Sequence, residues 1–337
     1  LQISISTLAL MAAAMVAGEP WQISLAIGLS LSLSSTAIVL QTLSEKGLMQ
    51  TGGGRASFSV LLTQDIAVIP ILAFMPLLAA QSILKISEDG SIQRASSAIT
   101  EHGSGLSLVD GLPGWAVTLV TIGLVALIVL AGIYLTRPVF RFIHAANLRE
   151  MYTALALLIV VGISFLMTLV GLSPALGAFL AGVVLANSEF RHELESDLTP
   201  FKGLLLGLFF ITVGAGINYQ LFLSDPGDLI GLALLVIVAK GSILYFVARA
   251  FGLKRRNRWL FTLGLAQAGE FGFVLLSFSR QLDVIPPALT EKLLLIVALS
   301  MLITPLLFIT YDLLSKRLGE SKSKAELEPD EIVEQGP

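Results

Sequence analysis

Apolar runs separated by short polar segments dominate the chain from its first residues to about residue 314. Each run has roughly 15 to 24 residues, close to the ~20 that a helix needs to cross the hydrocarbon core of a bilayer. Boundaries are placed where charge, proline or glycine interrupts a run. The pattern predicts an all-α, polytopic membrane protein with ten spans, at residues 3–17, 21–43, 56–78, 115–136, 151–170, 173–187, 201–218, 229–249, 259–280 and 291–314.

Composition narrows the class further. Of 337 residues, 55% are apolar and 13% are charged, against roughly 25% charged residues in a soluble domain. These values exclude a soluble globular protein. The chain has no cysteine, which excludes disulfides and thiolate metal sites within it. We expect a protein that works in the lipid bilayer, neither an enzyme nor a partner of nucleic acid.

Lysine and arginine are unequally distributed between the two sides that the spans define. Sixteen lie on the side of the C-terminus and four on the other, with Lys240 left inside a span. Because cytoplasmic loops carry the excess of positive charge, both ends of the chain are predicted to be cytoplasmic. The polar loop 79–114 is then extracytoplasmic, and the charged tail 315–337 is a cytoplasmic linker.

Three ionisable side chains fall near the middle of predicted spans: Asp65, Lys240 and Glu270. Such groups are costly in lipid, so each is a candidate functional residue. Gln64 precedes Asp65, so an amide oxygen and a carboxylate stand side by side, and such oxygens suit a hard cation. An alternative is that Asp65 and Lys240 form a salt bridge that holds the bundle together.

Polar and small residues interrupt two spans at mid-membrane depth. They are Ser30, Ser32, Ser34, Ser35 and Thr36 in the second span and Gln267, Gly269, Glu270 and Gly272 in the ninth. Hydroxyl groups can replace lost backbone hydrogen bonds, so both spans are predicted to be discontinuous helices that line a cavity. The alternative is two straight helices with small residues at their packing faces.

The order of these features suggests an inverted repeat. Residues 1–78 give a span, a broken span and a span with Asp65, and residues 229–314 give a span with Lys240, a broken span and a final span. The two triplets cross the membrane in opposite directions, as in transporters that bind their substrate where the repeats meet.

Five stretches resemble the monovalent cation:proton antiporter-2 family, in particular its Kef-type, glutathione-regulated potassium/proton efflux systems. They are LSLSSTAIVLQTLSEKGL (31–48), FSVLLTQDIAVIPILAFMPLL (58–78), GLSPALGAFLAGVVLANSEFRHELESDLTPFKGLLLGLFFITVGAGIN (171–218), GLAQAGEFGFV (264–274) and IVALSMLITPLL (296–307). Together they extend over nearly the whole chain.

The resemblance implies a sodium/proton-antiporter-like fold in a bacterial inner-membrane homodimer, with about three further helices upstream of Leu1. Core helices in 1–78 and 229–314 would move against linker and scaffold helices in 115–218. A Rossmann-type regulatory domain would follow the linker 315–337 and bind nucleotide and glutathione. No cofactor is expected within the chain itself, and no metal beyond the transported monovalent cation.

The resemblance also assigns roles to single residues. Asp65 would bind the cation and the proton, with Gln64 as its neighbour and Lys240 as the core lysine. The predicted loop 189–202 would be the place where the regulatory domain holds transport shut, through His192, Glu193, Glu195 and Asp197. Its other interpretation is an acidic, solvated turn. Electrogenic relatives carry an acid where this chain has Gln64, which favours electroneutral exchange.

A mechanism follows if Asp65 holds a proton or a monovalent cation but never both, because either one removes the charge that attracts the other. Ser35, Thr36 and freed backbone carbonyls would replace hydration water around the ion. Glu270 and Lys240 would balance the partial charges of the half-helix ends. Potassium is the expected cation and sodium the alternative.

Other classes of protein compete with this interpretation. Residues 212–216 resemble a potassium-channel filter, but they occur once and within a span. An intramembrane protease would need a buried histidine or a second membrane aspartate, and His102, His144 and His192 all fall in predicted loops. An ion-binding receptor that does not transport is the third alternative.

Overall fold

The computed structural model describes residues 1–79, 84–86, 92–94, 149–170, 173–186 and 191–317, with short pieces between 123 and 139. Its elements are α1 (Gln2–Val16), α2 (Trp21–Ser32), α3 (Thr36–Glu45), α4 (Gly52–Ala79), β1 (Leu84–Ile86), β2 (Ile92–Arg94), α6 (Arg149–Leu169), α7 (Pro174–Ala186), α8 (Arg191–Ala215), α9 (Tyr219–Ser224), α10 (Pro226–Ala250), α11 (Arg255–Leu265), α12 (Glu270–Gln281) and α13 (Pro287–Arg317). The helical fold class is confirmed. The predicted span 115–136 lies largely outside the described residues.

Length and hydropathy identify a membrane protein. Within the described ranges, six stretches are long and apolar enough to span a bilayer: Trp21–Glu45, Gly52–Ala79, Leu194–Ala215, Pro226–Ala250, Arg255–Gln281 and Pro287–Ser315. Three shorter apolar helices, Gln2–Val16, Thr153–Leu169 and Pro174–Ala186, coincide with further predicted spans. The chain is therefore an integral membrane protein.

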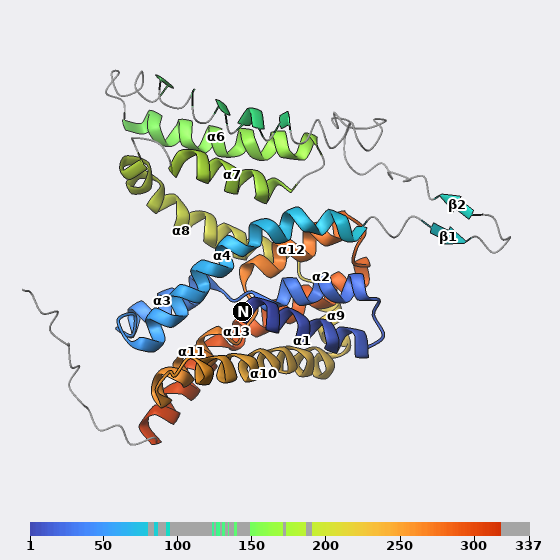
Figure 1. The fold of residues 1–337 in the computed structure, drawn as a ribbon, viewed down its shortest axis with the longest axis vertical. Coiled ribbons are helices and arrows are strands. Elements are labelled where there is room, and N and C mark those ends of the chain that lie inside the picture. Colours follow the sequence, from blue (N-terminus) through green and yellow to red (C-terminus); the bar gives the residue numbers. More distant parts are fainter. Residues whose placement is uncertain are drawn as a thin grey trace, which may run out of the picture.

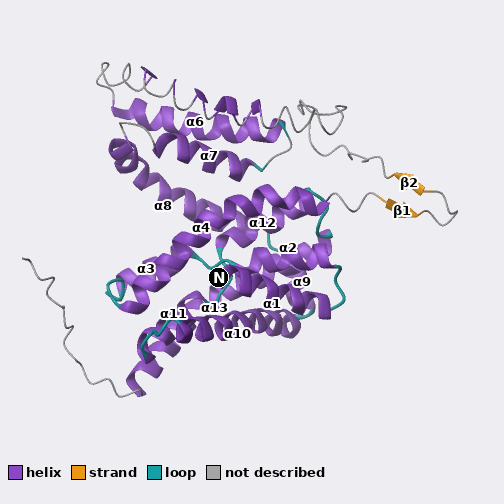
Figure 2. Ribbon diagram, viewed as in Figure 1, coloured by secondary structure: helices purple, strands orange, loops and turns teal. Residues whose placement is uncertain are grey.

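Both predicted interruptions are present. The second span divides into α2 and α3, with residues 33–35 between them, and the ninth divides into α11 and α12, with residues 266–269 between them. Figure 2 draws both as loop in the middle of the larger body, close to the mark of the N-terminus. The two halves of each interrupted span, Trp21–Glu45 and Arg255–Gln281, together remain long and apolar enough to cross a bilayer.

The helices form a larger body and a smaller one. Helices α6 and α7 pack on each other at one edge, while α1, α2, α4, α10, α12 and α13 share the largest buried apolar cluster. Figure 1 shows α8 running from α6 and α7 toward α4 and α12, so this helix joins the two bodies. We call the larger body, made of α1–α4 and α10–α13, the core body.

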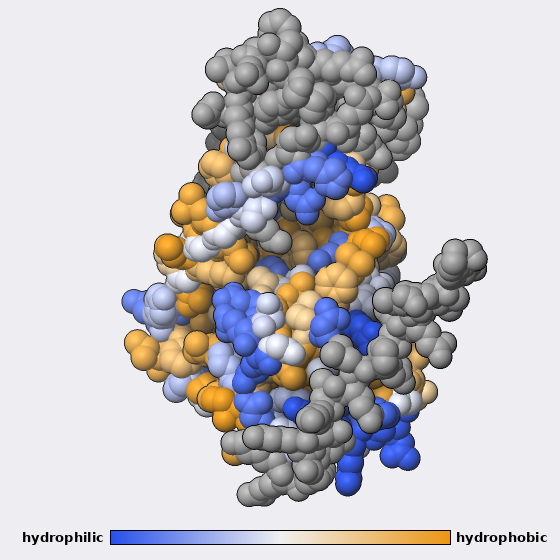
Figure 3. All heavy atoms as spheres, turned by 90° about the vertical axis from the view of Figure 1, so that its left-hand side faces the viewer, coloured by the Kyte–Doolittle hydropathy of each residue, from blue (hydrophilic) through white to orange (hydrophobic). Residues whose placement is uncertain are grey.

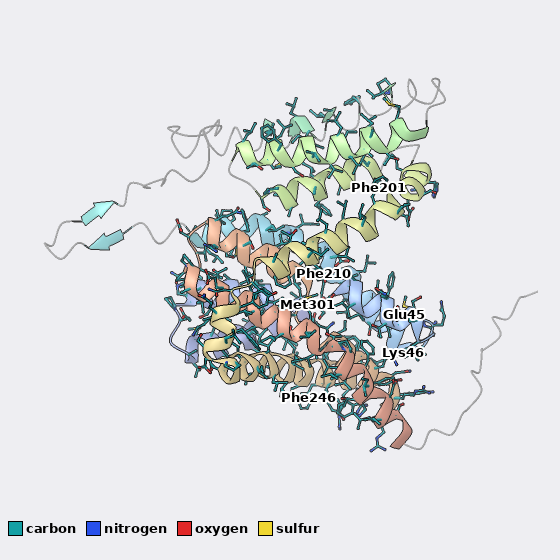
Figure 4. The ribbon with its side chains drawn as sticks, turned by 180° about the vertical axis from the view of Figure 1, so that it is seen from behind. Glu45, Lys46, Phe201, Phe210, Phe246 and Met301 are labelled. Carbon is teal, nitrogen blue, oxygen red and sulfur yellow. The ribbon has the colours of Figure 1, made fainter. Side chains whose placement is uncertain are left out.

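Helix α8 meets the core body along a loosely filled seam. The rings of Phe209 on α8 and Phe273 on α12 lie edge to face, with centroids 6.1 Å apart. Three hollows flank this contact, and Val213 and Phe273 line all of them. Figure 4 labels Phe210 and Met301 beside each other, and both line one of these hollows.

Two elements differ from the sequence predictions. The segment 191–202, predicted as a loop, is the beginning of α8, because its charged residues follow one another without proline or glycine before Pro200. His192 is therefore helical, although exposed. In the predicted loop 79–114, β1 and β2 pair antiparallel, with Lys85 opposite Gln93, so the described residues are not purely helical.

Polar helix ends gather at one end of the molecule. The C-terminal ends of α3 and α13 and the N-terminal ends of α8 and α11 lie on the left in Figure 1. Figure 3 faces this end and shows hydrophilic side chains spread over it. Lys46, after α3, and Asp312, in α13, form an ion pair of 2.6 Å here, with side chains 35% and 41% exposed.

Candidate functional site

The two interruptions cross in direct contact. A Cβ atom added at Gly269 would overlap the carbonyl group of Ser34 and lie 2.7 Å from the backbone nitrogen of Ser35. The Ser34 hydroxyl donates to the carbonyl oxygen of Leu265, the last residue of α11, at 2.7 Å. Only a residue without a side chain fits at position 269, so this glycine permits the crossing.

Lys240 lies where two half-helices end. It projects from α10, is fully buried, and donates from Nζ to the carbonyl oxygens of Leu33 (2.9 Å) and Gln267 (2.6 Å) and to the Ser34 hydroxyl (3.3 Å). Leu33 is the C-cap residue directly after α2, and Gln267 lies two residues after the end of α11. The ammonium group thus sits at the negative ends of both half-helices and satisfies carbonyls that the interruptions free. Its three acceptors are neutral oxygens, and the carboxylate of Asp65 is not among them.

The two half-helices that begin at the crossing meet a carboxylate. Glu270 is the first residue of α12, and its Oε1 accepts a hydrogen bond from the backbone nitrogen of Ala37, near the start of α3, at 3.4 Å. A negative charge at two helix N-termini is electrostatically favourable. Ser35 caps α3 itself, because its hydroxyl accepts from the backbone nitrogen of Ile38.

Asp65 faces the start of α3. It projects from the middle of α4 and is half-buried, and its Oδ1 accepts a hydrogen bond from the Thr36 hydroxyl at 2.9 Å. Since Thr36 is the first residue of α3, this hydrogen bond places the carboxylate at the interruption of the second span. A carboxylate inside a membrane-spanning helix is a candidate functional group, because such groups are costly in lipid.

The sequence suggests that the Gln64 amide lies beside Asp65 as an oxygen ligand for a cation, whereas in the structure the amide bonds to other protein groups. It is buried, its Oε1 accepts from the backbone nitrogen of Ser34 at 2.8 Å, and its Nε2 donates to Oε1 of Gln2 on α1 at 2.8 Å. The amide therefore holds the interruption, and both its oxygen and its nitrogen have a hydrogen-bond partner within the protein. Sequence reasoning missed Gln2, although a glutamine inside an apolar run is a signal that could have identified it.

Unpartnered polar atoms also lie at the crossing. The Gln267 side chain is fully buried, and neither its Oε1 nor its Nε2 has a hydrogen-bond partner within the part of the chain that the structure describes. The same holds for Oε2 of Glu270. Buried polar atoms without partners are costly, so the crossing offers oxygens that an ion or water could use. Gly272 lies one turn on, where an added Cβ would be 3.4 Å from the carbonyl oxygen of Ser30.

The remaining candidates lie apart from the crossing. His192 and Glu195 are exposed in the first turns of α8, which also carries Glu193 and Asp197. Residues 212–215 are helical in α8, so the filter-like stretch does not have the extended backbone of a channel filter. Among the described residues, no group of three or more histidines, aspartates or glutamates could hold a metal ion.

Comparisons with known proteins agree with this architecture. Residues 1–309 match the sequence model of a family described as sodium/hydrogen exchanger, transmembrane. The chain is also 42% identical, over 324 residues, to the glutathione-regulated potassium-efflux system protein KefC of Escherichia coli O17:K52:H18, strain UMN026. KefC of Escherichia coli O6:H1, strain CFT073, is 42% identical over 323 residues. These alignments cover 96% of this chain and 48% of each relative, so the chain spans about half the length of the curated relatives it matches.

Proposed function

The chain belongs to the sodium/hydrogen exchanger family of membrane transporters, and we propose that it exchanges a monovalent cation for protons by alternating access. The observation that carries the proposal is the half-buried carboxylate of Asp65 at the point where one of two crossing, interrupted helices resumes. Such crossings are where transporters of inverted-repeat architecture bind their ions.

Competition at Asp65 provides the coupling. A protonated Asp65 has no charge to attract a cation, and a bound cation disfavours protonation. The carboxylate therefore carries the cation across the membrane in one direction and a proton in the other, never both together. Because position 64 is an amide rather than a second acid, we propose electroneutral exchange of one cation for one proton.

The ligands of the cation come from the same crossing. Its first ligand is a carboxylate oxygen of Asp65, next to the hydroxyl oxygen of Thr36, and Ser35 and freed carbonyls complete the shell. Thr36 now donates its proton to Asp65, so binding requires this hydroxyl to rotate and present a lone pair to the ion. The neighbouring charges, Lys240 and Glu270, stay in place and stabilise the interrupted backbone.

Alternating access requires one part of the protein to move against another. The loosely filled seam between α8 and the core body supports such movement, because hollows flank the Phe209–Phe273 contact on several sides. In the proposal, the core helices of 1–78 and 229–314 slide as a unit along α8 and the rest of the scaffold, 115–218.

We propose potassium as the transported cation, because the KefC relatives carry potassium efflux in their names. Sodium is the second candidate, since the matching family is described by sodium. Oxygen sites that select potassium differ in size and field strength from those that select sodium. Transport assays with each cation distinguish the two candidates directly.

Three further features complete the proposal. The chain acts as a homodimer in a bacterial inner membrane, with both ends cytoplasmic. A cytoplasmic regulatory domain that binds nucleotide and glutathione controls it. The regulatory domain contacts the start of α8, where His192 and Glu195 are exposed. These residues belong to an acidic helical surface that can bind the domain.

The experiment is a flux assay in proteoliposomes with a trapped pH dye, run with potassium outside and then with sodium. Wild-type protein should raise the internal pH when potassium is added to the outside, and Asp65→Asn should abolish the response while its melting temperature stays close to that of the wild type. Normal proton-coupled flux from folded Asp65→Asn would contradict the proposal. A response to sodium alone would assign the second cation.

A further inference from the structure

A second buried amide stands behind Gln64. Gln2 on α1 is only 5% exposed, and its Oε1 accepts the hydrogen bond of Gln64 Nε2. Its Nε2 donates to the Ser6 hydroxyl at 3.1 Å and to the carbonyl oxygen of Ser32 at 3.3 Å. Ser32 is the last residue of α2, so Gln2 reaches the same interruption as Gln64 but binds a different backbone group.

The hydrogen bonds of the two amides fix each other's direction. A backbone carbonyl can only accept, so the nitrogen of the Gln2 amide must face Ser32 and its oxygen must face Gln64. Gln64 must then present its nitrogen to Gln2 and its oxygen to the backbone N–H of Ser34. Turning either amide over would bring two donors or two acceptors together inside the protein, which is costly.

We propose that Gln2 is a positioning residue for cation exchange: through Gln64, it holds residues 32–34 so that Thr36 meets Asp65. The inference rests on the function proposed above and extends it to a residue on α1 whose hydrogen bonds go to Ser6, Ser32 and Gln64. Thr36 is two residues beyond Ser34, whose N–H Gln64 holds, so a change in the Gln2–Gln64 pair moves the hydroxyl that Asp65 uses.

The pair also explains why position 64 is an amide. A carboxylate there could accept from the Ser34 N–H, but it could not donate to Oε1 of Gln2. Two acceptors would then face each other in a buried setting. Gln2 therefore selects a neutral side chain beside Asp65, which leaves Asp65 as the one carboxylate of α4 at this interruption.

Two substitutions of Gln2 test this role in flux assays. Gln2→Leu keeps the size and removes every hydrogen bond, whereas Gln2→Glu in its ionised form keeps an acceptor for Gln64 but cannot donate to Ser32. Both should raise the half-saturating cation concentration about 10-fold, the effect of one buried hydrogen bond, with a smaller change in maximal rate and a shifted pH profile. The matched control, Ser6→Ala, leaves the bonds to Ser32 and Gln64 in place and should change these values little.

A second measurement does not depend on transport. The chain has no cysteine, and Ser32 is fully buried, so Ser32→Cys supplies a single thiol at the interruption. We expect maleimide to label this thiol about 10-fold faster when Gln2→Leu or Gln2→Glu is also present. If Gln2→Leu does not fold, Gln2→Glu carries the test.

The outcomes separate the two proposals. Wild-type protein without any exchange would contradict the proposed function, and the labelling rates would still show whether Gln2 holds the interruption. Folded Gln2 variants with unchanged labelling would overturn the inference. So would variants that melt earlier but keep the half-saturating concentration and pH profile of the wild type, because Gln2 would then support only the fold.

Discussion

At the scale of single residues, each charged side chain at the crossing lies at helix ends of the opposite partial charge. The ammonium of Lys240 meets carbonyl oxygens where α2 and α11 end, and the carboxylate of Glu270 lies where α3 and α12 begin. Both charges thus lie at helix ends whose dipoles have the opposite sign. In the proposed function, Asp65 binds the transported ions, while Lys240 and Glu270 stabilise the interrupted backbone.

This arrangement predicts a specific loss of stability. Lys240→Met keeps the aliphatic length but leaves the carbonyl oxygens of Leu33 and Gln267 without their donor. Leaving two buried acceptors unpaired should lower the free energy of unfolding by about 3 kcal/mol. Thermal melting in detergent measures the change.

The exposed lysine of the Lys46–Asp312 pair supplies the control. Lys46→Met breaks an ion pair in solvent and should cost less than about 1 kcal/mol. Equal melting temperatures for Lys240→Met and Lys46→Met would show that Lys240 does not hold the interruptions.

At the scale of helices, both breaks could be predicted, because polar and small residues at mid-span depth have few other uses in lipid. The positions of Ser34 and Gly269 in sequence already located the breaks to within a few residues. The partners were not predictable. Gln64 contacts Gln2, 62 residues away in the chain. Which side chain becomes the partner of Gln64 depends on how α1 packs against α2 and α4. The start of α8 was also missed, because its charged residues show no apolar periodicity.

The close contact at the crossing predicts a strong effect of one methyl group. Gly269→Ala would force its Cβ into the backbone of Ser34 and Ser35. It should abolish exchange and destabilise the protein by about 3 kcal/mol, since overpacked sites relax only by moving backbone. Flux and melting assays check both effects.

Gly231→Ala is the matched control on α10, because nothing lies within 4 Å of its added Cβ. It should retain full exchange and wild-type stability. Active, stable Gly269→Ala would mean that the two interruptions do not need to touch.

At the scale of the whole molecule, the proposal depends on motion between the core body and α8. A double variant, Phe209→Cys on α8 and Phe273→Cys on α12, can be cross-linked with a cleavable bifunctional maleimide. The cross-link should stop exchange, and cleaving it should restore exchange. Each single variant treated with the same reagent should keep its activity. Full exchange in the cross-linked protein would exclude sliding along this seam.

The most direct measurement of the central claim is proton release when the cation binds. Purified protein in weakly buffered detergent solution is mixed with potassium chloride, and a pH dye follows the solution. If one carboxylate holds either ion in turn, wild-type protein releases a proton for each cation bound, and Asp65→Asn releases none. Cation binding without proton release in the wild type, or equal release from Asp65→Asn, would contradict the account.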